Sequence, residues 1–242
     1  MNIVVDIGNS FIKVAVFNKD EIIHQEQFLS GRLEVLNTVF IQFPSIENGI
    51  ISLVGSPDKK INKLLHSKLK KLILLNENTL LPIDNLYKTK KTLGKDRLAA
   101  VVGANYLFPE KDILVIDAGT AITFDFINSN GQYHGGSISP GLHMRFKALH
   151  EFTSNLPLLA PREHFSSPAG TTEDSIITGV QSGMINEIKG IINEYKEQYP
   201  ELITVLTGGD AIFFEKILKN SIFVDLNLVL KGLNRILSCN AQ

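Results

Sequence analysis

Several features that would place this chain in a common protein class are missing. Cys239 is the only cysteine among 242 residues, so no intrachain disulfide can form. Lys and Arg number 24 against 25 Asp and Glu, which gives no electrostatic reason to expect nucleic acid or an anionic membrane as the main partner. No apolar run reaches the roughly 18 residues that span a bilayer, and no basic stretch precedes Asp6 as it would in a secretory signal. We therefore expect a cytoplasmic protein that binds neither nucleic acid nor membrane.

Two common nucleotide-binding motifs are also missing from the sequence. There is no G-x-x-x-x-G-K-[ST] phosphate loop and no G-x-G-x-x-G dinucleotide fingerprint. Two clusters of lysines occur, and each reads most simply as a solvated face; the second lies close to G-K-D-R at 94–97, where an anionic substrate could use it. The clusters are Lys68, Lys70 and Lys71, and Lys88, Lys90 and Lys91.

What the chain does have is an internal repeat. Residues 3–17 read IVVDIGNSFIKVAVF, and residues 114–127 read LVIDAGTAITFDFI. Each copy is an apolar strand that ends in Asp, then x-Gly and a small polar residue, then a second apolar strand. The two Asp residues, Asp6 and Asp117, lie 111 positions apart, and a duplicated unit of this kind sets the architecture of a chain.

The segments around the two copies predict two similar α/β halves, 1–110 and 111–242. Each half begins with a three-strand meander and continues with alternating helices and strands. Strands are predicted at 21–29, 49–56, 131–139 and from 201, and helices at 33–43, 61–69, 97–108, 141–150, 173–199 and 225–237. The architecture that this order favours is that of actin-like (ribonuclease-H-like) ATPases and sugar kinases, in which a mixed sheet with a meander is flanked by helices.

The chemistry of the turns agrees with that architecture. Glycine lets a backbone approach a ligand closely, and successive amides in such a turn form a concavity for anions. Asp6 stands where a hydrated divalent cation could bridge it to phosphates, and Lys13, which shares a strand face with Phe11, offers a point charge. D-A-G-T-A at 117–121 repeats the arrangement with Thr120, and T-G-G-D-A at 207–211 adds a third small-residue turn.

In the order and spacing of its motifs the chain resembles the type III pantothenate kinases along nearly its whole length. The motifs that carry the resemblance are D-I-G-N-S at 6–10 with Lys13, G-K-D-R at 94–97, D-A-G-T-A at 117–121, G-G-S-I-S-P-G at 135–141, L-P at 156–157, G-T-T at 170–172 and T-G-G-D at 207–210. The resemblance implies ATP-dependent phosphorylation of pantothenate to 4′-phosphopantothenate, the first committed step toward coenzyme A. It also implies a homodimer, a divalent cation such as Mg²⁺ and a monovalent cation, K⁺ or NH₄⁺.

The resemblance also implies a role for particular residues. Asp96 would be the proton acceptor, Asp117 would hold the monovalent cation, and Asp6 would hold the divalent cation through water. The ATP-binding residues would be Asp6, Ile7, Gly8, Asn9, Ser10, Phe11, Ile12, Lys13 and Thr120. The substrate-binding residues would be Tyr87, Gly94, Lys95, Asp96, Arg97 and Thr172. Lys95 occupies a variable position of its motif.

Local sequence leaves simpler interpretations open for several of these residues. Asp96 has the composition of an N-cap for a helix from Arg97 to Phe108. Thr171 and Asp174 have the spacing of a capping box, so Thr172 could merely fill the first turn of the long helix. His143 and His150 lie seven residues apart with no third ligand in view, and we interpret both as structural. Two other functions stay open at this point, a kinase of the same fold for another alcohol or sugar and a non-catalytic nucleotide-binding regulator.

Overall fold

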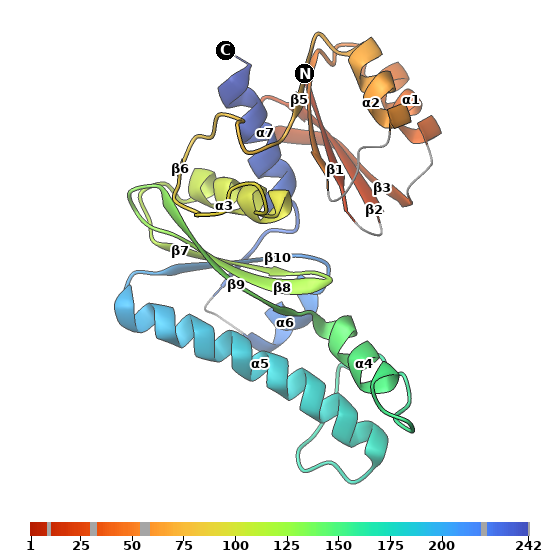
Figure 1. Ribbon diagram of the computed structural model, residues 1–242, viewed down its shortest axis with the longest axis vertical. Coiled ribbons are helices and arrows are strands. Elements are labelled where there is room, and N and C mark those ends of the chain that lie inside the picture. Colours follow the sequence, from red (N-terminus) through yellow and green to blue (C-terminus); the bar gives the residue numbers. More distant parts are fainter. Residues whose placement is uncertain (9–10, 30–32, 54–58, 219–221, 242) are drawn as a thin grey trace. The chain divides into compact units, whose positions relative to one another are not determined.

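The chain folds into two compact units, which are described one at a time. The structure, a computed structural model, describes residues 1–8, 11–29, 33–53, 59–218 and 222–241 (Figure 1). The first unit comprises Met1–Leu107 with Asn227–Gln242, and the second comprises Phe108–Leu226. We placed the boundary near residue 110 and the C-terminal helix in the second half. The structure instead places this helix in the first unit, because it packs against the helix that begins at Lys95.

The first unit is built on a five-stranded sheet in the order β3-β2-β1-β4-β5. Strands β1, β2 and β3 form the antiparallel meander, and β4 and β5 continue the sheet in parallel with β1. The elements are β1 (Asn2–Ile7), β2 (Phe11–Asn18), β3 (Glu21–Leu29), β4 (Asn48–Leu53), β5 (Lys71–Leu74), the short β6 (Asp84–Asn85), α1 (Leu33–Gln42), α2 (Lys59–Lys68), α3 (Lys95–Leu107) and α7 (Leu228–Asn240).

Alternation along the strands divides the core of this unit into two layers. Successive side chains of a strand point to opposite faces of the sheet. Ile3 and Val5 of β1 pack with α1 and α2 on one face, whereas Val4 packs with α3 and α7 on the other. Asp6 therefore continues the row of Val4, on the face that α3 and α7 cover.

Helices α3 and α7 approach each other through two glycines. A Cβ atom on Gly232 would lie 1.8 Å from the carbonyl oxygen of Ala99, and one on Gly103 would lie 2.4 Å from that of Leu228. Neither position has room for a side chain, so the two backbones touch directly. Asn234 of α7, which is almost fully buried, accepts a hydrogen bond from Asn2 and donates one to the carbonyl of Lys19. These contacts tie the C-terminal helix to the first sheet and to α3.

The second unit repeats the topology of the first. Its strands follow the order β11-β10-β7-β8-β9, with β7-β8-β9 as the antiparallel meander and β10 parallel to β7. Helices α4, α5 and α6 cover one face of this sheet (Figure 1). The elements are β7 (Ile113–Ala118), β8 (Ala121–Ile127), β9 (Gln132–Pro140), β10 (Ile203–Thr207), β11 (Phe223–Val224), α4 (Leu142–Glu151), α5 (Thr172–Gln198) and α6 (Ala211–Leu218).

The prediction of two similar α/β halves is confirmed in its architecture. Both meanders and each of the predicted helices are present, with ends that differ by a few residues. The sequence predicts no strand at the positions of the short elements β5, β6 and β11. Within the described ranges no helix is long and apolar enough to cross a membrane.

Candidate active site

The turn after β1 places Asp6 between two polar neighbours. In the sheet register Asp6 lies opposite Lys13 of the antiparallel strand β2 and opposite Ser52 of the parallel strand β4. The amide of Gly8 donates a 3.0 Å hydrogen bond to the carbonyl of Phe11, which closes the turn. Because paired residues on neighbouring strands share a face, the carboxylate, the ammonium and the hydroxyl lie on the same side of the sheet.

The rest of this predicted ATP segment divides between core and surface. The side chain of Ile12 is buried in the core against α1 and α2, so any contribution of Ile12 to a ligand would come from its backbone. Phe11 is exposed, and Ile7 and Gly8 are partly exposed. Asn9 and Ser10 lie outside the described residues.

The electrostatic surroundings of Asp6 are unusual for an aspartate. Burial, the largest effect, and the nearby charge of Asp96 raise its pKa from 3.8 to about 6, against the opposing effects of Ser52 and Lys13. A carboxyl group in such a place exchanges its proton near neutral pH, as functional-site carboxylates often do. The effect of Asp96 also shows that the two predicted acidic residues of this unit lie close enough to interact.

Ser52 is a member of this site that the sequence interpretation missed. It is fully buried, and its hydroxyl has no hydrogen bond of ordinary geometry within the described part of the chain, yet it lowers the pKa of the neighbouring Asp6. The dipole of a hydroxyl beside a carboxylate stabilises the ionised form. The signal in the sequence was a single polar residue in the apolar strand GIISL, which strand periodicity alone does not flag.

Lys95, Asp96 and Arg97 of the G-K-D-R motif begin α3, so the alternative interpretation of Asp96 as the N-cap of a helix that starts at Arg97 is wrong. The helix begins at Lys95, so Asp96 is its second residue and Gly94 precedes the helix. The Oδ1 atom of Asp96 accepts a 2.8 Å hydrogen bond from the amide of Arg97. The same atom would lie 2.5 Å from a Cβ on Gly94, so the carboxylate occupies the space that the glycine leaves.

The geometry of Asp96 leaves one oxygen available. Its Oδ1 accepts from the amide of the next helical residue, Arg97, while its Oδ2 makes no hydrogen bond to any described residue. The local structural role and a chemical role are therefore compatible, because they use different oxygens of one carboxylate.

Arg97 and Tyr87 lie together beside this carboxylate. Only 5% of Arg97 is exposed, and its guanidinium carbon lies 5.7 Å from the centre of the Tyr87 ring. A guanidinium at this distance from an aromatic face is attracted by the ring and held in orientation. Lys95 is partly exposed at the start of the helix. The predicted substrate residues Tyr87, Gly94, Lys95, Asp96 and Arg97 thus form one cluster in the first unit.

In the second unit two glycine turns pack on the D-A-G-T-A turn that holds Asp117. Gly208 has φ +97°, and a Cβ there would lie 2.5 Å from both the Oδ1 of Asp117 and the carbonyl of Ala118. A Cβ on Gly141 would lie 2.4 Å from the carbonyl of Thr120. The turns T-G-G-D and G-G-S-I-S-P-G therefore pack directly on D-A-G-T-A, which explains why all three occur in one chain.

The two histidines that we interpreted as structural differ from each other. His150 contacts the carbonyl of Leu156 through its Nδ1, 2.8 Å away, which is a local structural bond. His143 on α4 places its Nε2 3.6 Å from the Oδ1 of Asp210, in the T-G-G-D turn. Burial raises the pKa of Asp210, and His143 partly opposes this. His143 therefore lies at one of the predicted turns, which its spacing from His150 did not suggest.

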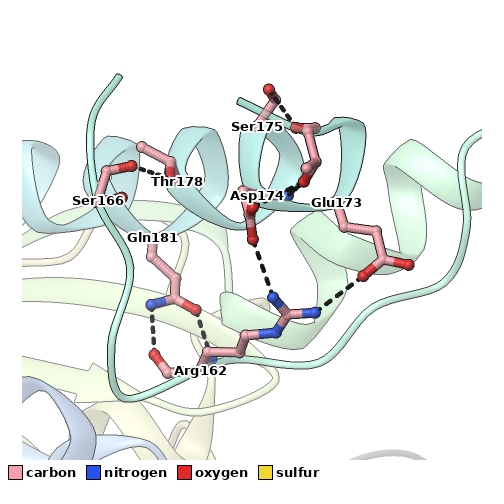
Figure 2. A network of polar contacts seen from close by, with 8 residues as sticks. Arg162, Ser166, Glu173, Asp174, Ser175, Thr178 and Gln181 are labelled. Atoms are coloured by element: carbon pink, nitrogen blue, oxygen red, sulfur yellow. Dashed lines mark hydrogen bonds and ion pairs between the residues drawn. The ribbon is translucent and has the colours of Figure 1, made fainter. Parts of the chain in front are cut away.

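Thr172 is the first residue of α5 and is exposed. Thr171 is the N-cap that its spacing from Asp174 predicts, because its hydroxyl accepts a 3.1 Å hydrogen bond from the amide of Asp174; the hydroxyl also donates a 2.8 Å bond to the carboxylate of Asp174. The same helix start is held by Arg162, which contacts Glu173 and Asp174 (Figure 2).

The donor chemistry suits cations that keep much of their water. Asp6 and Asp117 each place a carboxylate at the end of the first strand of a meander. In the described ranges no group of three or more His, Cys, Asp or Glu side chains lies together in a way that could hold a metal. Mg²⁺ is commonly held by one or two carboxylates together with waters and phosphates, and the Asp6 environment fits that pattern.

Comparisons with known proteins agree on one family. The family described as "Type III pantothenate kinase" matches residues 2–194. A type III pantothenate kinase from Phocaeicola vulgatus is 47% identical over 240 residues, and one from Christiangramia forsetii is 43% identical over 241 residues. These alignments cover 99% of this chain and 99% of each relative.

Solved structures are similar to this chain in fold. A protein from Campylobacter jejuni, described as a proposed Baf family transcriptional activator, gives a TM-score of 0.63 at 23% identity, over 99% of this chain and 98% of that one. A ROK hexokinase from Thermus thermophilus gives 0.51 at 12% identity, over 99% of both chains. The fold is that of actin-like ATPases and ROK sugar kinases.

Proposed function

This chain belongs to the type III pantothenate kinase family, and from that premise we propose that it transfers the γ-phosphoryl group of ATP to the primary alcohol of pantothenate. The product is 4′-phosphopantothenate, and the reaction is the first step of coenzyme A synthesis. The observation that carries the proposal is the carboxylate of Asp96, which has one oxygen without a hydrogen bond to the described residues and lies near Asp6 in the same unit.

The phosphates of ATP are assigned to the turn after β1. Phosphoryl transfer requires neutralisation of charge and in-line placement more than covalent help. Lys13 supplies a positive charge opposite Asp6. The assigned ATP-binding residues are Asp6, Ile7, Gly8, Asn9, Ser10, Phe11, Ile12 and Lys13, with Thr120 from the second unit.

Asp96 is assigned to the alcohol of the acceptor. Its Oδ2 accepts or orients the proton of the hydroxyl, while its Oδ1 stays on the amide of Arg97 and fixes the carboxylate. Arg97, whose guanidinium donates in a fixed fork, holds a carboxylate or amide oxygen of pantothenate with the ring of Tyr87 beside it. Gly94, Lys95 and Thr172 complete the assigned substrate site.

Two cations belong to the proposal. Asp6 holds a divalent cation through water, and Asp117 holds a monovalent cation, K⁺ or NH₄⁺. When bound, these ions neutralise the negative charge of the phosphates. We further propose that the enzyme is a homodimer and that it acts in the cytoplasm.

An acceptor screen tests the proposed reaction. Purified protein is incubated with ATP and Mg²⁺, with and without K⁺, and ADP release is measured with pantothenate, simple sugars or other small alcohols. We expect ADP release that depends on both pantothenate and K⁺. Turnover with a sugar but not with pantothenate would contradict the proposed acceptor, and binding of ATP with no turnover on any acceptor would favour a regulatory protein.

A further inference from the structure

The segment between α4 and α5 is fastened to α5 by side chains. Residues 153–171 contain no helix or strand, and they lead directly into Thr172. Besides the cap residue Thr171, two of these residues bond to α5: Arg162 contacts the first and third turns of α5, and the carbonyl of Ser166 accepts a 2.9 Å hydrogen bond from Thr178 (Figure 2). Side chains of α5 therefore hold this segment at Arg162 and at Ser166.

The backbone of Arg162 is held at both of its polar groups. Its amide donates to the Oε1 of Gln181 at 2.8 Å, and its carbonyl accepts from the Nε2 of the same side chain at 2.9 Å. Gln181 is fully buried on α5, so this amide group is a fixed anchor rather than a mobile surface contact. A buried polar group paired at both ends specifies one conformation of the chain.

The side chain of Arg162 connects the segment to the first turn of α5. Its Nη2 lies 3.0 Å from the Oε2 of Glu173, and its Nη1 lies 3.0 Å from the Oδ1 of Asp174. Asp174 is also the partner of the cap residue Thr171. Thr172 lies in the sequence between the cap residue Thr171 and the two acidic residues. The guanidinium therefore contacts both of the residues that directly follow Thr172 at the start of α5.

We propose that Arg162 is a positioning residue that fixes Thr172 for the binding of pantothenate. This inference rests on the proposed function, in which Thr172 contacts the acceptor. About half of each side chain in these ion pairs is exposed, with 47% for Arg162, 55% for Glu173 and 46% for Asp174. Exposed pairs of this kind add little to global stability. The effect of the arginine is therefore local, on the shape of the segment that ends at Thr172.

The test compares Arg162→Ala with a neighbouring control, Glu163→Ala. Glu163 belongs to the same segment and forms an ion pair that is at least as exposed, but its partner is Lys216 of α6 rather than the start of α5. For Arg162→Ala we expect KM for pantothenate to rise about 10-fold, with kcat and KM for ATP changed less than about 2-fold. Glu163→Ala leaves all three constants near those of the parent. Arg162→Lys, which cannot span both carboxylates, gives an intermediate KM.

A second readout does not depend on turnover. In amide hydrogen exchange of the ligand-free protein, Arg162→Ala speeds exchange across residues 163–172, while the remaining protected amides of α5 and the overall unfolding midpoint stay as in the parent. Unchanged exchange in this segment together with an unchanged KM for pantothenate would overturn the inference.

Thr172→Val separates this inference from the proposed function. If Thr172→Val raises KM for pantothenate and Arg162→Ala does not, the positioning role is wrong while the proposed function stands. If the parent protein does not phosphorylate pantothenate at all, the proposed function fails, and the inference fails with it even where hydrogen exchange shows that Arg162 orders the segment.

Discussion

The two units place an aspartate at the same point of the same topology. Asp6 is the next-to-last residue of β1, and Asp117 is the next-to-last residue of β7. Each has a hydroxyl residue opposite it on the parallel neighbour, Ser52 on β4 and Thr207 on β10. The sequence repeat covers the first two strands of each unit. In the structure the similarity includes a third strand, because β4 and β10 each place a hydroxyl residue opposite the aspartate.

The units differ on the antiparallel side. Lys13 of β2 lies opposite Asp6, whereas Thr123 of β8 lies opposite Asp117. The turn between the strands also differs, with residues 8–10 in the first unit and 119–120 in the second. A positive charge beside the aspartate suits a site for phosphates, and a neutral hydroxyl suits a site for a cation. In the proposed assignment, one scaffold therefore serves two kinds of site that differ in a single facing residue.

The largest expected difference is between replacing Gly208, in the turn after β10, and Gly8, in the turn after β1, by alanine. Gly208→Ala places a methyl group 2.5 Å from backbone atoms of Ala118 at a positive φ, so we expect a loss of about 2–4 kcal/mol in the free energy of unfolding. Gly8→Ala meets only the carbonyl of Phe11, at 3.4 Å, and costs less than about 1 kcal/mol. Denaturant unfolding measures both, and equal losses would mean that the turns are packed alike.

Removal of the lysine charge tests the chemical difference. Lys13→Met removes a charged contact to phosphate and lowers kcat/KM for ATP by about 10–100-fold, which corresponds to the 1.5–3 kcal/mol of a charged hydrogen bond. Thr123→Val, its counterpart on β8, changes kcat/KM for ATP less than about 3-fold. Steady-state kinetics at varied ATP concentration measures both variants. An equal loss of kcat/KM for ATP in the two variants would contradict the comparison.

Replacement of Asp6 by asparagine is expected to raise the free energy of unfolding and to lower activity. Because folding raises its pKa from 3.8 to about 6, Asp6 favours the folded state below pH 4, and this contribution is lost as the pH rises to 6. Asp6→Asn is therefore more stable than the parent at pH 8, by about 2–3 kcal/mol, and the difference narrows toward pH 4.

The stability effect is accompanied by a loss of activity, because the asparagine cannot provide the carboxylate assigned to the divalent cation. Denaturant unfolding from pH 4 to pH 8 measures the first effect and ADP release measures the second. A variant that was less stable than the parent at pH 8 would disprove the assignment of a buried charge to Asp6.

The smallest expected effect concerns Ser52. Ser52→Ala removes a group that lowers the pKa of Asp6, so the acid side of the pH–activity profile moves to higher pH. The plateau value of kcat changes less than about 2-fold, because Ser52 contacts no reacting group in the proposal. Thr204→Val is a matched control, since Thr204 is also a buried hydroxyl without a hydrogen bond in the described chain, and it should not move the profile.

Much of the site follows from local patterns in the sequence. Strand parity places Lys13 on the face of Phe11, away from buried Ile12, and the spacing of Thr171 and Asp174 predicts a cap at Thr171 that the structure confirms. These predictions succeed because they depend on neighbours within a few residues, where backbone geometry leaves few alternatives.

The rest depends on contacts between distant segments. Ser52 lies beside Asp6 because β4 pairs in parallel with β1 in this register, and no local sequence pattern encodes that pairing. The position of the C-terminal helix depends on the contact between Gly232 and Ala99, more than 100 residues apart. Local composition suggests Arg97 as the first residue of α3, whereas the helix begins at Lys95. The Asp96 carboxylate occupies the space where a side chain of Gly94 would lie, and composition alone does not reveal this contact.

The central claim is that Asp96 serves the acceptor hydroxyl, and Asp96→Asn tests it most directly. The asparagine keeps an oxygen for the amide of Arg97, so the helix start is preserved while the charge is lost. In pantothenate-dependent ADP release we predict that kcat falls about 10²–10⁴-fold with little change in the binding of ATP. A variant that retained near-normal kcat would contradict the assignment of Asp96.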